Sequence, residues 1–259
     1  MVRDRLTARP RVLEARRRLW SEALTLPGQP DLATSLVAEL ADYLGVPAPD
    51  VELRCVTAAI ELVHLWEAGE RRTPEQIDAY YDAADAYLYD LTWWHGLNES
   101  DSALVQVAAL ECALDSEAGT ALDFGSGIGS LGLLFAHLGI ETALADVNPR
   151  LNDYAHWRFD RRGLRADVID LRHEALPEDR FDLISAIDVF EHLAEPAAAL
   201  TTLAGALQPG GTIFLHFPVG ADPSHPMHLW ESHDEVHRAA GAIGLMVEQA
   251  GWTLLLRKG

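Results

Sequence analysis

A glycine-rich turn directly after a short apolar run constrains this sequence more than any other feature. The stretch reads Ala121-Leu122-Asp123-Phe124-Gly125-Ser126-Gly127-Ile128-Gly129, and a helical pattern follows it. Glycines allow a tight turn and let a ligand approach the backbone, and open α/β sheets bind ligands at the carboxyl ends of their strands. The stretch therefore predicts a ligand-binding loop at the end of the first strand of such a sheet.

The residues after this loop alternate between β-rich and helical runs. The β-rich runs cover residues 120–124, 142–146, 166–170, 181–187 and 212–217, and two more, 245–249 and 252–257, are separated by Ala250-Gly251. Alternation of strand and helix is typical of a parallel sheet covered on both faces, and the last spacing is typical of a hairpin. We expect an α/β fold: a Rossmann-like, doubly wound, seven-stranded and mostly parallel sheet with an antiparallel terminal hairpin.

The first hundred residues have a different periodicity. Apolar residues recur every three or four positions over 31–45, 50–69 and 73–95, which predicts helices. We place a boundary near residues 96–101, with Ser100 or Asp101 capping the next helix. The predicted organisation is an all-α, substrate-binding cap over residues 1–98 and a cofactor-binding domain over residues 99–259.

Charge limits the partners of this chain. Twenty basic and forty acidic side chains give a formal net charge of −20, which opposes binding to a phosphate backbone, so we expect no nucleic-acid substrate. Seven arginines nevertheless lie in the first twenty residues. This basic start docks onto the acidic body of its own chain, docks onto a second copy in a homodimer, or forms a solvated helix; the sequence leaves the three open.

A few single residues exclude or disfavour other classes of protein. The only lysine, Lys258, is next to last, which excludes a P-loop and disfavours a pyridoxal phosphate enzyme. Cys55 and Cys112 are isolated, which indicates a reducing compartment. Because no apolar stretch is long enough for a membrane span or a signal peptide, we expect a cytoplasmic protein without a membrane partner.

Two carboxylates limit the classes of ligand that the glycine loop can bind. Asp123 precedes the loop, where it would repel a pyrophosphate but suits an ammonium or a sulfonium. Asp146 stands 21 residues past Gly125, at the end of the second strand, where an acid accepts both ribose hydroxyls of an adenosine. The spacing G-x-G-x-G also differs from the G-x-G-x-x-G of dinucleotide folds. Glycines that merely turn the chain, or a nicotinamide nucleotide, are the alternatives.

With these motifs, residues 100–259 resemble the class I S-adenosylmethionine (SAM)-dependent methyltransferases. The matching pieces are the glycine loop, Asp146, residues 181–193 and the Leu-x-Pro-Gly-Gly turn at residues 207–211. The resemblance implies SAM as the cofactor, held by three groups of residues. These are Asp123, Gly125, Ser126, Gly127 and Gly129 on the methionine part, Asp146 on the ribose with Val147, Asp170 and Leu171 on the adenine, and Ile187 and Asp188 near the amino acid moiety.

Acidic and histidine side chains follow the fourth and fifth strands. Asp188, Glu191 and His192 are spaced i, i+3 and i+4, so they share a face if they open a helix, and His228 follows the fifth strand on the same rim. His192 and His228 are candidate general bases. The set also looks like the metal site of some ubiquinone-pathway and small-RNA 2′-O-methyltransferases, but we assign no metal ligand. Structural hydrogen bonding is the third alternative.

Aromatic residues concentrate before the predicted boundary. Tyr80, Tyr87 and Trp94 recur every seven residues, with Tyr81 beside them. Residues 77–96 are similar to the N-terminal segment of cyclopropane fatty acid synthases and of tocopherol or phosphoethanolamine methyltransferases, in which a tyrosine closes over the cofactor. We assign Tyr80 to cofactor binding and Tyr81 to catalysis; the alternative is that these rings form the core of the cap.

The motif that marks methyltransferases of nucleobases and glutamine amides, Asn/Asp-Pro-Pro-aromatic, is absent after the fourth strand. We therefore expect a SAM-dependent methyltransferase of a small molecule, with O-methylation as the first hypothesis. One alternative is a SAM-consuming cyclase or lyase that releases methylthioadenosine. Another is a regulatory protein that binds SAM without turnover.

Overall fold

A single sheet of seven strands forms the centre of the molecule in a computed structural model that describes residues 10–97, 102–220, 222, 224–230 and 232–259. The strand order is β3-β2-β1-β4-β5-β7-β6, and β7 runs antiparallel to both of its neighbours. The strands are β1 (Thr120–Phe124), β2 (Glu141–Asp146), β3 (Asp167–Asp170), β4 (Phe181–Ile187), β5 (Leu207–His216), β6 (Met246–Ala250) and β7 (Thr253–Arg257). The predicted fold class is confirmed, including the terminal hairpin.

The first strand lies at the centre of the parallel part. Leu122 pairs with Ala143 of β2 and with Ile184 of β4, and all three side chains are buried. From β1 the chain winds outward to β3 on one side and then returns to β4 on the other. The order of the strands therefore reverses between β1 and β4, and a crevice for ligands opens at such a point beyond the carboxyl ends of the strands.

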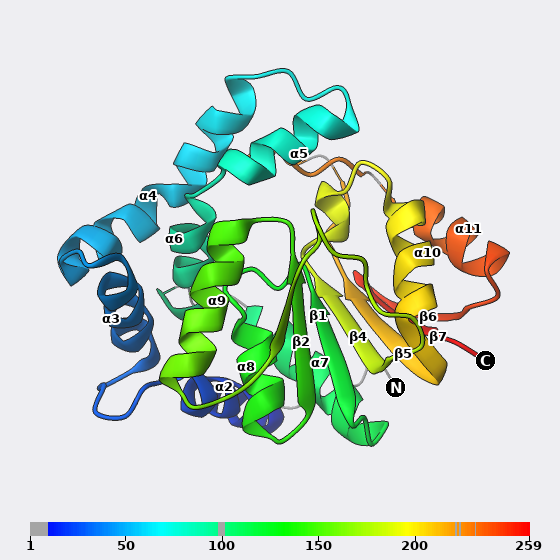
Figure 1. Cartoon of the computed structure of the whole chain (residues 1–259), viewed down its shortest axis with the longest axis horizontal. Helices are drawn as coiled ribbons and strands as arrows, with labels where there is room; N and C mark the ends of the chain where they lie inside the picture. Colours follow the sequence, from blue (N-terminus) through cyan, green and yellow to red (C-terminus); the bar gives the residue numbers. More distant parts are fainter. Residues whose placement is uncertain (1–9, 98–101, 221, 223, 231) are drawn as a thin grey trace.

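Helices cover both faces of the sheet. The covering helices are α2 (Pro10–Leu24), α7 (Ser102–Asp115), α8 (Ser130–His137), α9 (Pro149–Arg161), α10 (Pro196–Ala206) and α11 (Asp234–Ala242). Trp20 and Leu24 of α2 share one buried cluster with residues of α7, α8 and α9, and a second cluster joins α10 and α11 to the opposite face. Figure 1 shows α10 and α11, in yellow and orange, on the side of the molecule away from the blue helices of residues 32–67.

The remaining helices form a cap. They are α3 (Leu32–Leu44), α4 (Ala48–Glu67), α5 (Pro74–Ala83), α6 (Tyr87–Thr92) and a π-helical turn (Trp93–Leu97). Asp31 caps the start of α3 through the N–H of Thr34, and Gly45 ends that helix at φ 67°, as the periodicity predicts. The core of the cap also contains Ile128 of the glycine loop. The division at residues 98 and 99 stays a prediction, and α2 packs with the sheet.

The single helix predicted over residues 73–95 is wrong, because the chain breaks between α5 and α6. Ala84 adopts φ −84° and ψ 60°, outside the helical region, and a new helix begins at Tyr87. The expected stripe of aromatic rings is interrupted as a result: Tyr80 is 1% exposed, whereas Trp94 is 38% exposed. The predicted capping by Ser100 or Asp101 lies outside the described residues.

Within the described part of the basic start, Arg16 contacts the body of its own chain, whereas Arg11, Arg17 and Arg18 are exposed. Arg16 is 4% exposed, and its Nε donates to Oε1 of Glu111 on α7 at 2.9 Å. Arg3, Arg5 and Arg9 lie outside the described residues, and a homodimer stays a prediction. None of the helices in the described ranges has both the length and the apolar character that crossing a bilayer requires.

Candidate active site

The glycine loop adopts a conformation that other residues rarely reach. Gly125, Gly127 and Gly129 have φ angles of 69°, 53° and 72°. A Cβ added to Gly125 would lie 2.3 Å from Cγ2 of Val189, and one on Gly127 would lie 2.6 Å from Cδ1 of Leu91. The left-handed backbone and the close neighbouring side chains therefore both favour glycine at these two positions. The cap residue Leu91 shows that the cap reaches the loop, a contact that sequence reasoning missed.

Asp146 holds the loop to the end of β2. Its side chain is 8% exposed, and its two oxygens accept from the N–H of Gly127 at 2.8 Å and of Asn148 at 2.9 Å. Each carboxylate oxygen has two lone pairs, so both keep one acceptor position. Asp146 is therefore placed to fix the loop and still to accept hydroxyl groups of a ligand.

A second acidic side chain and an unpartnered hydroxyl lie beside the loop. Asp123 is 5% exposed, and Oγ of Ser185 on β4 donates to it at 3.3 Å. Burial raises the pKa of Asp123 to about 7, although Ser185 opposes the shift. Oγ of Ser126 is buried without a hydrogen-bond partner among the described residues. Both groups favour a polar, cationic ligand.

The residues assigned to the adenine follow the ends of β2 and β3. Val147 is 37% exposed, and the N–H of Leu171 donates to the carbonyl of Asp146 at 3.1 Å. Asp170 pairs with Arg172 at 2.9 Å, and this guanidinium holds the pKa of Asp170 below its usual value. The structure thus brings Asp170 and Leu171 beside Asp146. Their contacts with adenine stay a prediction.

Asp188 departs from the predicted arrangement. Ile187 ends β4, and Asp188 follows in a left-handed conformation with φ 54°, its N–H donating to the carbonyl of His216 at 2.8 Å. A short 3-10 helix then covers Phe190–His192. The shared helical face of Asp188, Glu191 and His192 is therefore wrong, because backbone pairing with β5 turns Asp188 out of that helix.

Histidines from two strand ends meet near the cap. The rings of His192 and His228 lie 5.0 Å apart, and that of His192 lies 5.9 Å from Tyr81. Nδ1 of His192 lies 3.3 Å from the carbonyl of Met227, which only accepts, so Nδ1 carries the proton and Nε2 keeps its lone pair. Burial lowers the pKa of His192 to about 3 and that of His228 to about 4. Both rings are neutral at pH 7.

Glu191 completes a set of possible metal ligands. It is 1% exposed, and its Oε2 has no hydrogen-bond partner within the part of the chain that the structure describes. One ligand atom each from Glu191, His192 and His228 lies within 4.8 Å of the others. Burial, with Asp188 adding to it, raises the pKa of Glu191 well above its usual value. This set suits either proton transfer or a divalent ion, and Asp188 lies outside it.

The two candidate tyrosines occupy different environments. Tyr80 is 1% exposed in the core of the cap, and its hydroxyl donates to the carbonyl of Leu62 at 3.3 Å, which favours packing over cofactor contact. The ring of Tyr81 stacks on Tyr87, and its buried hydroxyl has no hydrogen-bond partner among the residues described. Burial raises the pKa of Tyr81 well above 10, so it stays a neutral donor.

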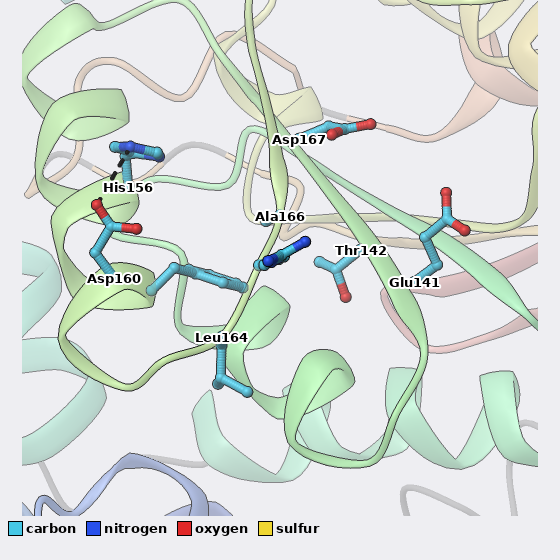
Figure 2. Close-up of a pocket in the computed structure, with 9 residues that line it drawn as sticks. Glu141, Thr142, His156, Asp160, Leu164, Ala166 and Asp167 are labelled. Carbon is cyan, nitrogen blue, oxygen red and sulfur yellow. Dashed lines mark ion pairs between the residues drawn. The ribbon is translucent and has the colours of Figure 1, made fainter.

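A separate pocket of about 420 Å³ opens at the other end of the sheet. Figure 2 shows its lining side chains, with His156 and Asp160 of α9 paired at 3.5 Å and Glu141 at the start of β2. Parallel strands place their amino ends at the edge opposite to their carboxyl ends. The pocket therefore lies away from the glycine loop and contains none of the predicted site residues.

The residues around the loop fit SAM. The three glycines have left-handed backbone and close neighbours, which lets a ligand approach the main chain. The unpartnered Oγ of Ser126 and the buried carboxylates of Asp123 and Asp146 provide polar groups for a ribose and for a cation. When bound, SAM supplies a methyl group that its sulfonium has already activated. All of these residues lie at the carboxyl ends of β1 and β2, and the strand order reverses beside β1.

Comparisons with known proteins agree with this site. A family model described as a methyltransferase domain matches residues 93–256, more than half of the chain. A ubiquinone biosynthesis O-methyltransferase of Cereibacter sphaeroides strain ATCC 17029 is 39% identical over 92 residues, covering 35% of this chain and 37% of that protein. Its counterpart in Xanthomonas axonopodis pv. citri is 27% identical over 135 residues, covering 48% and 54%. The chain thus matches about half or less of these curated relatives.

Solved structures share the fold. The cyclase SpnF superposes with a TM-score of 0.53 at 20% identity, covering 68% of this chain and 74% of that one. A structure described as a sarcosine dimethylglycine methyltransferase from Galdieria sulphuraria gives 0.50 at 18% identity, covering 57% and 62%. Together, the strand order, the loop with its two carboxylates and the match of the family model show that the chain belongs to the class I SAM-dependent methyltransferase family.

Proposed function

We propose that this protein transfers the methyl group of SAM to a hydroxyl oxygen of a small molecule. The observation that carries the proposal is the series of Tyr81, His192 and His228, in which Nε2 of His192 is left as a proton acceptor. The two curated relatives described above are named O-methyltransferases, which supports oxygen as the acceptor atom.

The chain contributes positioning and proton transfer. Asp123, Asp146 and the glycine loop hold the cofactor, which converts an encounter of two reactants into a step within one complex. His192 accepts the proton of the acceptor hydroxyl at Nε2 while Met227 holds its Nδ1. Tyr81, as a neutral donor, orients the acceptor oxygen.

The experiment compares acceptors that differ in one atom. Purified protein is incubated with SAM and either catechol or 2-aminophenol, and the products are analysed by mass spectrometry. We expect S-adenosylhomocysteine together with O-methylated product. His192→Gln should lower kcat by about 10²-fold to 10⁴-fold, the usual contribution of a general base, with unchanged affinity for S-adenosylhomocysteine. His137→Gln, at the exposed end of α8, is the matched control. Methylation of nitrogen alone would contradict the proposal.

The same reactions distinguish the other functions. Methylthioadenosine formed from SAM without an acceptor would identify a cyclase or lyase. Failure to bind both SAM and S-adenosylhomocysteine would show that the glycine loop is not a SAM site. Loss of turnover with a chelator, restored by a divalent ion, would assign Glu191, His192 and His228 to a metal in place of a general base.

Cofactor affinity should depend on pH through Asp123. Because its pKa is raised to about 7, Asp123 loses its negative charge below that pH, and it then no longer attracts the cationic cofactor. The dissociation constant of SAM should therefore increase by about tenfold from about pH 8 to about pH 6, following the ionised fraction of a single acid. Isothermal titration calorimetry measures this change. Asp123→Asn should bind weakly at both pH values; an equally steep dependence in that variant would assign the effect to another group.

A further inference from the structure

Asn148 follows β2 directly and caps the helix after it. Its side chain is 3% exposed, and its Oδ1 accepts from the N–H groups of Arg150 at 2.9 Å and Leu151 at 3.2 Å. The first N–H groups of a helix lack partners within the helix, so this acceptor stabilises the start of α9. Pro149 occupies the first helical position, where its fixed φ is favourable.

The same side chain reaches across to the cap. Nδ2 of Asn148 donates to the carbonyl of Tyr81 at 2.8 Å, in the last turn of α5. Carbonyls in the last turn of a helix also need partners from outside it. The backbone N–H of Asn148 donates to the carboxylate of Asp146 at 2.9 Å. One residue therefore joins the ribose acid, the start of α9 and the candidate catalytic tyrosine.

Two ion pairs flank this contact. Arg150 pairs with Asp85 at 2.5 Å, and Arg172 pairs with Asp82 at 3.1 Å. The side chain of Arg150 is 63% exposed and that of Asp82 is 49% exposed. Exposed pairs of this kind contribute little to stability, because solvent screens them. The carbonyl of Tyr81 also accepts from the N–H of Ala84 at 3.4 Å, so the amide of Asn148 is the contact that holds this carbonyl from outside α5.

We propose that Asn148 is a positioning residue that couples the ribose site at Asp146 to the placement of Tyr81. A ligand that binds the Asp146 carboxylate stabilises the loop from which Asn148 extends. Through its hydrogen bond to the carbonyl of Tyr81, Asn148 then restricts the motion of the backbone at the end of α5. Only an amide meets the requirement, since Oδ1 must accept for α9 while Nδ2 donates to Tyr81. The coupling is reciprocal, so an ordered cap also favours cofactor binding. This inference rests on the proposed function only in that Tyr81 faces the acceptor.

The test uses Asn148→Ser, because serine caps a helix about as well as asparagine but has no amide nitrogen to donate to Tyr81 from the position of Nδ2. Hydrogen–deuterium exchange is measured with and without S-adenosylhomocysteine. In the wild type we expect the ligand to slow exchange of amides 79–85 by about tenfold, the effect of one well-made hydrogen bond. In Asn148→Ser this slowing should disappear, while amides 125–129 are still protected and the melting temperature changes little. Catechol turnover should fall by about tenfold in kcat/KM with the dissociation constant of S-adenosylhomocysteine within about threefold.

Two further variants complete the design. Asn148→Asp also caps α9 without donating to Tyr81, and should behave as Asn148→Ser does. Arg150→Gln removes only the exposed pair with Asp85 and should retain the wild-type exchange pattern. Equal protection of amides 79–85 in wild type and Asn148→Ser would overturn the inference. Failure of the proposed function gives a different result: no O-methylated product, with the exchange pattern intact.

Discussion

Replacing Glu39 with methionine should lower the free energy of unfolding by about 3–5 kcal/mol. Glu39 is fully buried, and Nε of Arg158 donates to its Oε2 at 3.0 Å, while Arg162 binds both carboxylate oxygens. Burial acts to raise the pKa of Glu39, but the two guanidinium groups outweigh it and hold the pKa below its usual value. The variant would leave two arginines at a buried site without their counter-charge.

Denaturant unfolding and calorimetry measure this effect, with a fall in melting temperature of about 10 °C for a chain of this length. Glu39→Gln keeps the shape and should cost less. Glu61→Gln is the matched control, because Glu61 pairs with Arg54 at 2.9 Å but the two side chains are 39% and 41% exposed. Equal losses in Glu39→Met and Glu61→Gln would show that the buried pair does not stabilise the fold.

Asp146→Ala should raise the dissociation constant of S-adenosylhomocysteine by at least about 100-fold, since two hydrogen bonds to a charged acceptor are lost. The loop should also become less ordered, because Gly127 loses the acceptor of its N–H. Isothermal titration calorimetry measures the affinity, and exchange of amides 125–129 reports on the loop.

Glu141→Gln provides the control for this variant. Glu141 is an acid at the opposite end of the same strand, with a side chain that is 65% exposed. Its substitution removes one negative charge from β2 without touching the loop, so affinity should stay within about twofold, as expected for a screened surface charge. If Asp146→Ala bound S-adenosylhomocysteine as tightly as the wild type, the assignment of Asp146 to the ribose would be wrong.

Local signals in the sequence were sufficient for the fold class of the sheet and for the glycine loop. They were not sufficient for the start of β5, which begins at Leu207, so the predicted turn at residues 207–211 is part of that strand. β1 and β4 have the predicted bounds, since short apolar runs between glycines and charged residues have clear ends. The helix over residues 73–95 was less predictable. Nothing in the composition of residues 84–86, which are Ala-Asp-Ala, indicates a break, and packing of the flanking tyrosines against α4 decides it.

The polar contacts between cap and sheet could not be predicted, because they join residues far apart in the chain. Glu39 and Arg158 are 119 residues apart, and neither belongs to a motif. Asn148 did carry a signal, since asparagine followed by proline is typical of a helix start. That signal indicates the cap on α9 but not the bond to Tyr81, which depends on how α5 lies over β2.

Ile128 belongs to the cofactor loop by sequence and to the core of the cap by packing: it is fully buried there, and Nη1 of Arg158 donates to its carbonyl at 2.6 Å. Exchanging the cap helices would therefore also alter the packing that supports the glycine loop. Substitutions in the cap should keep the residues around Ile128 if the conformation of this loop is to be preserved.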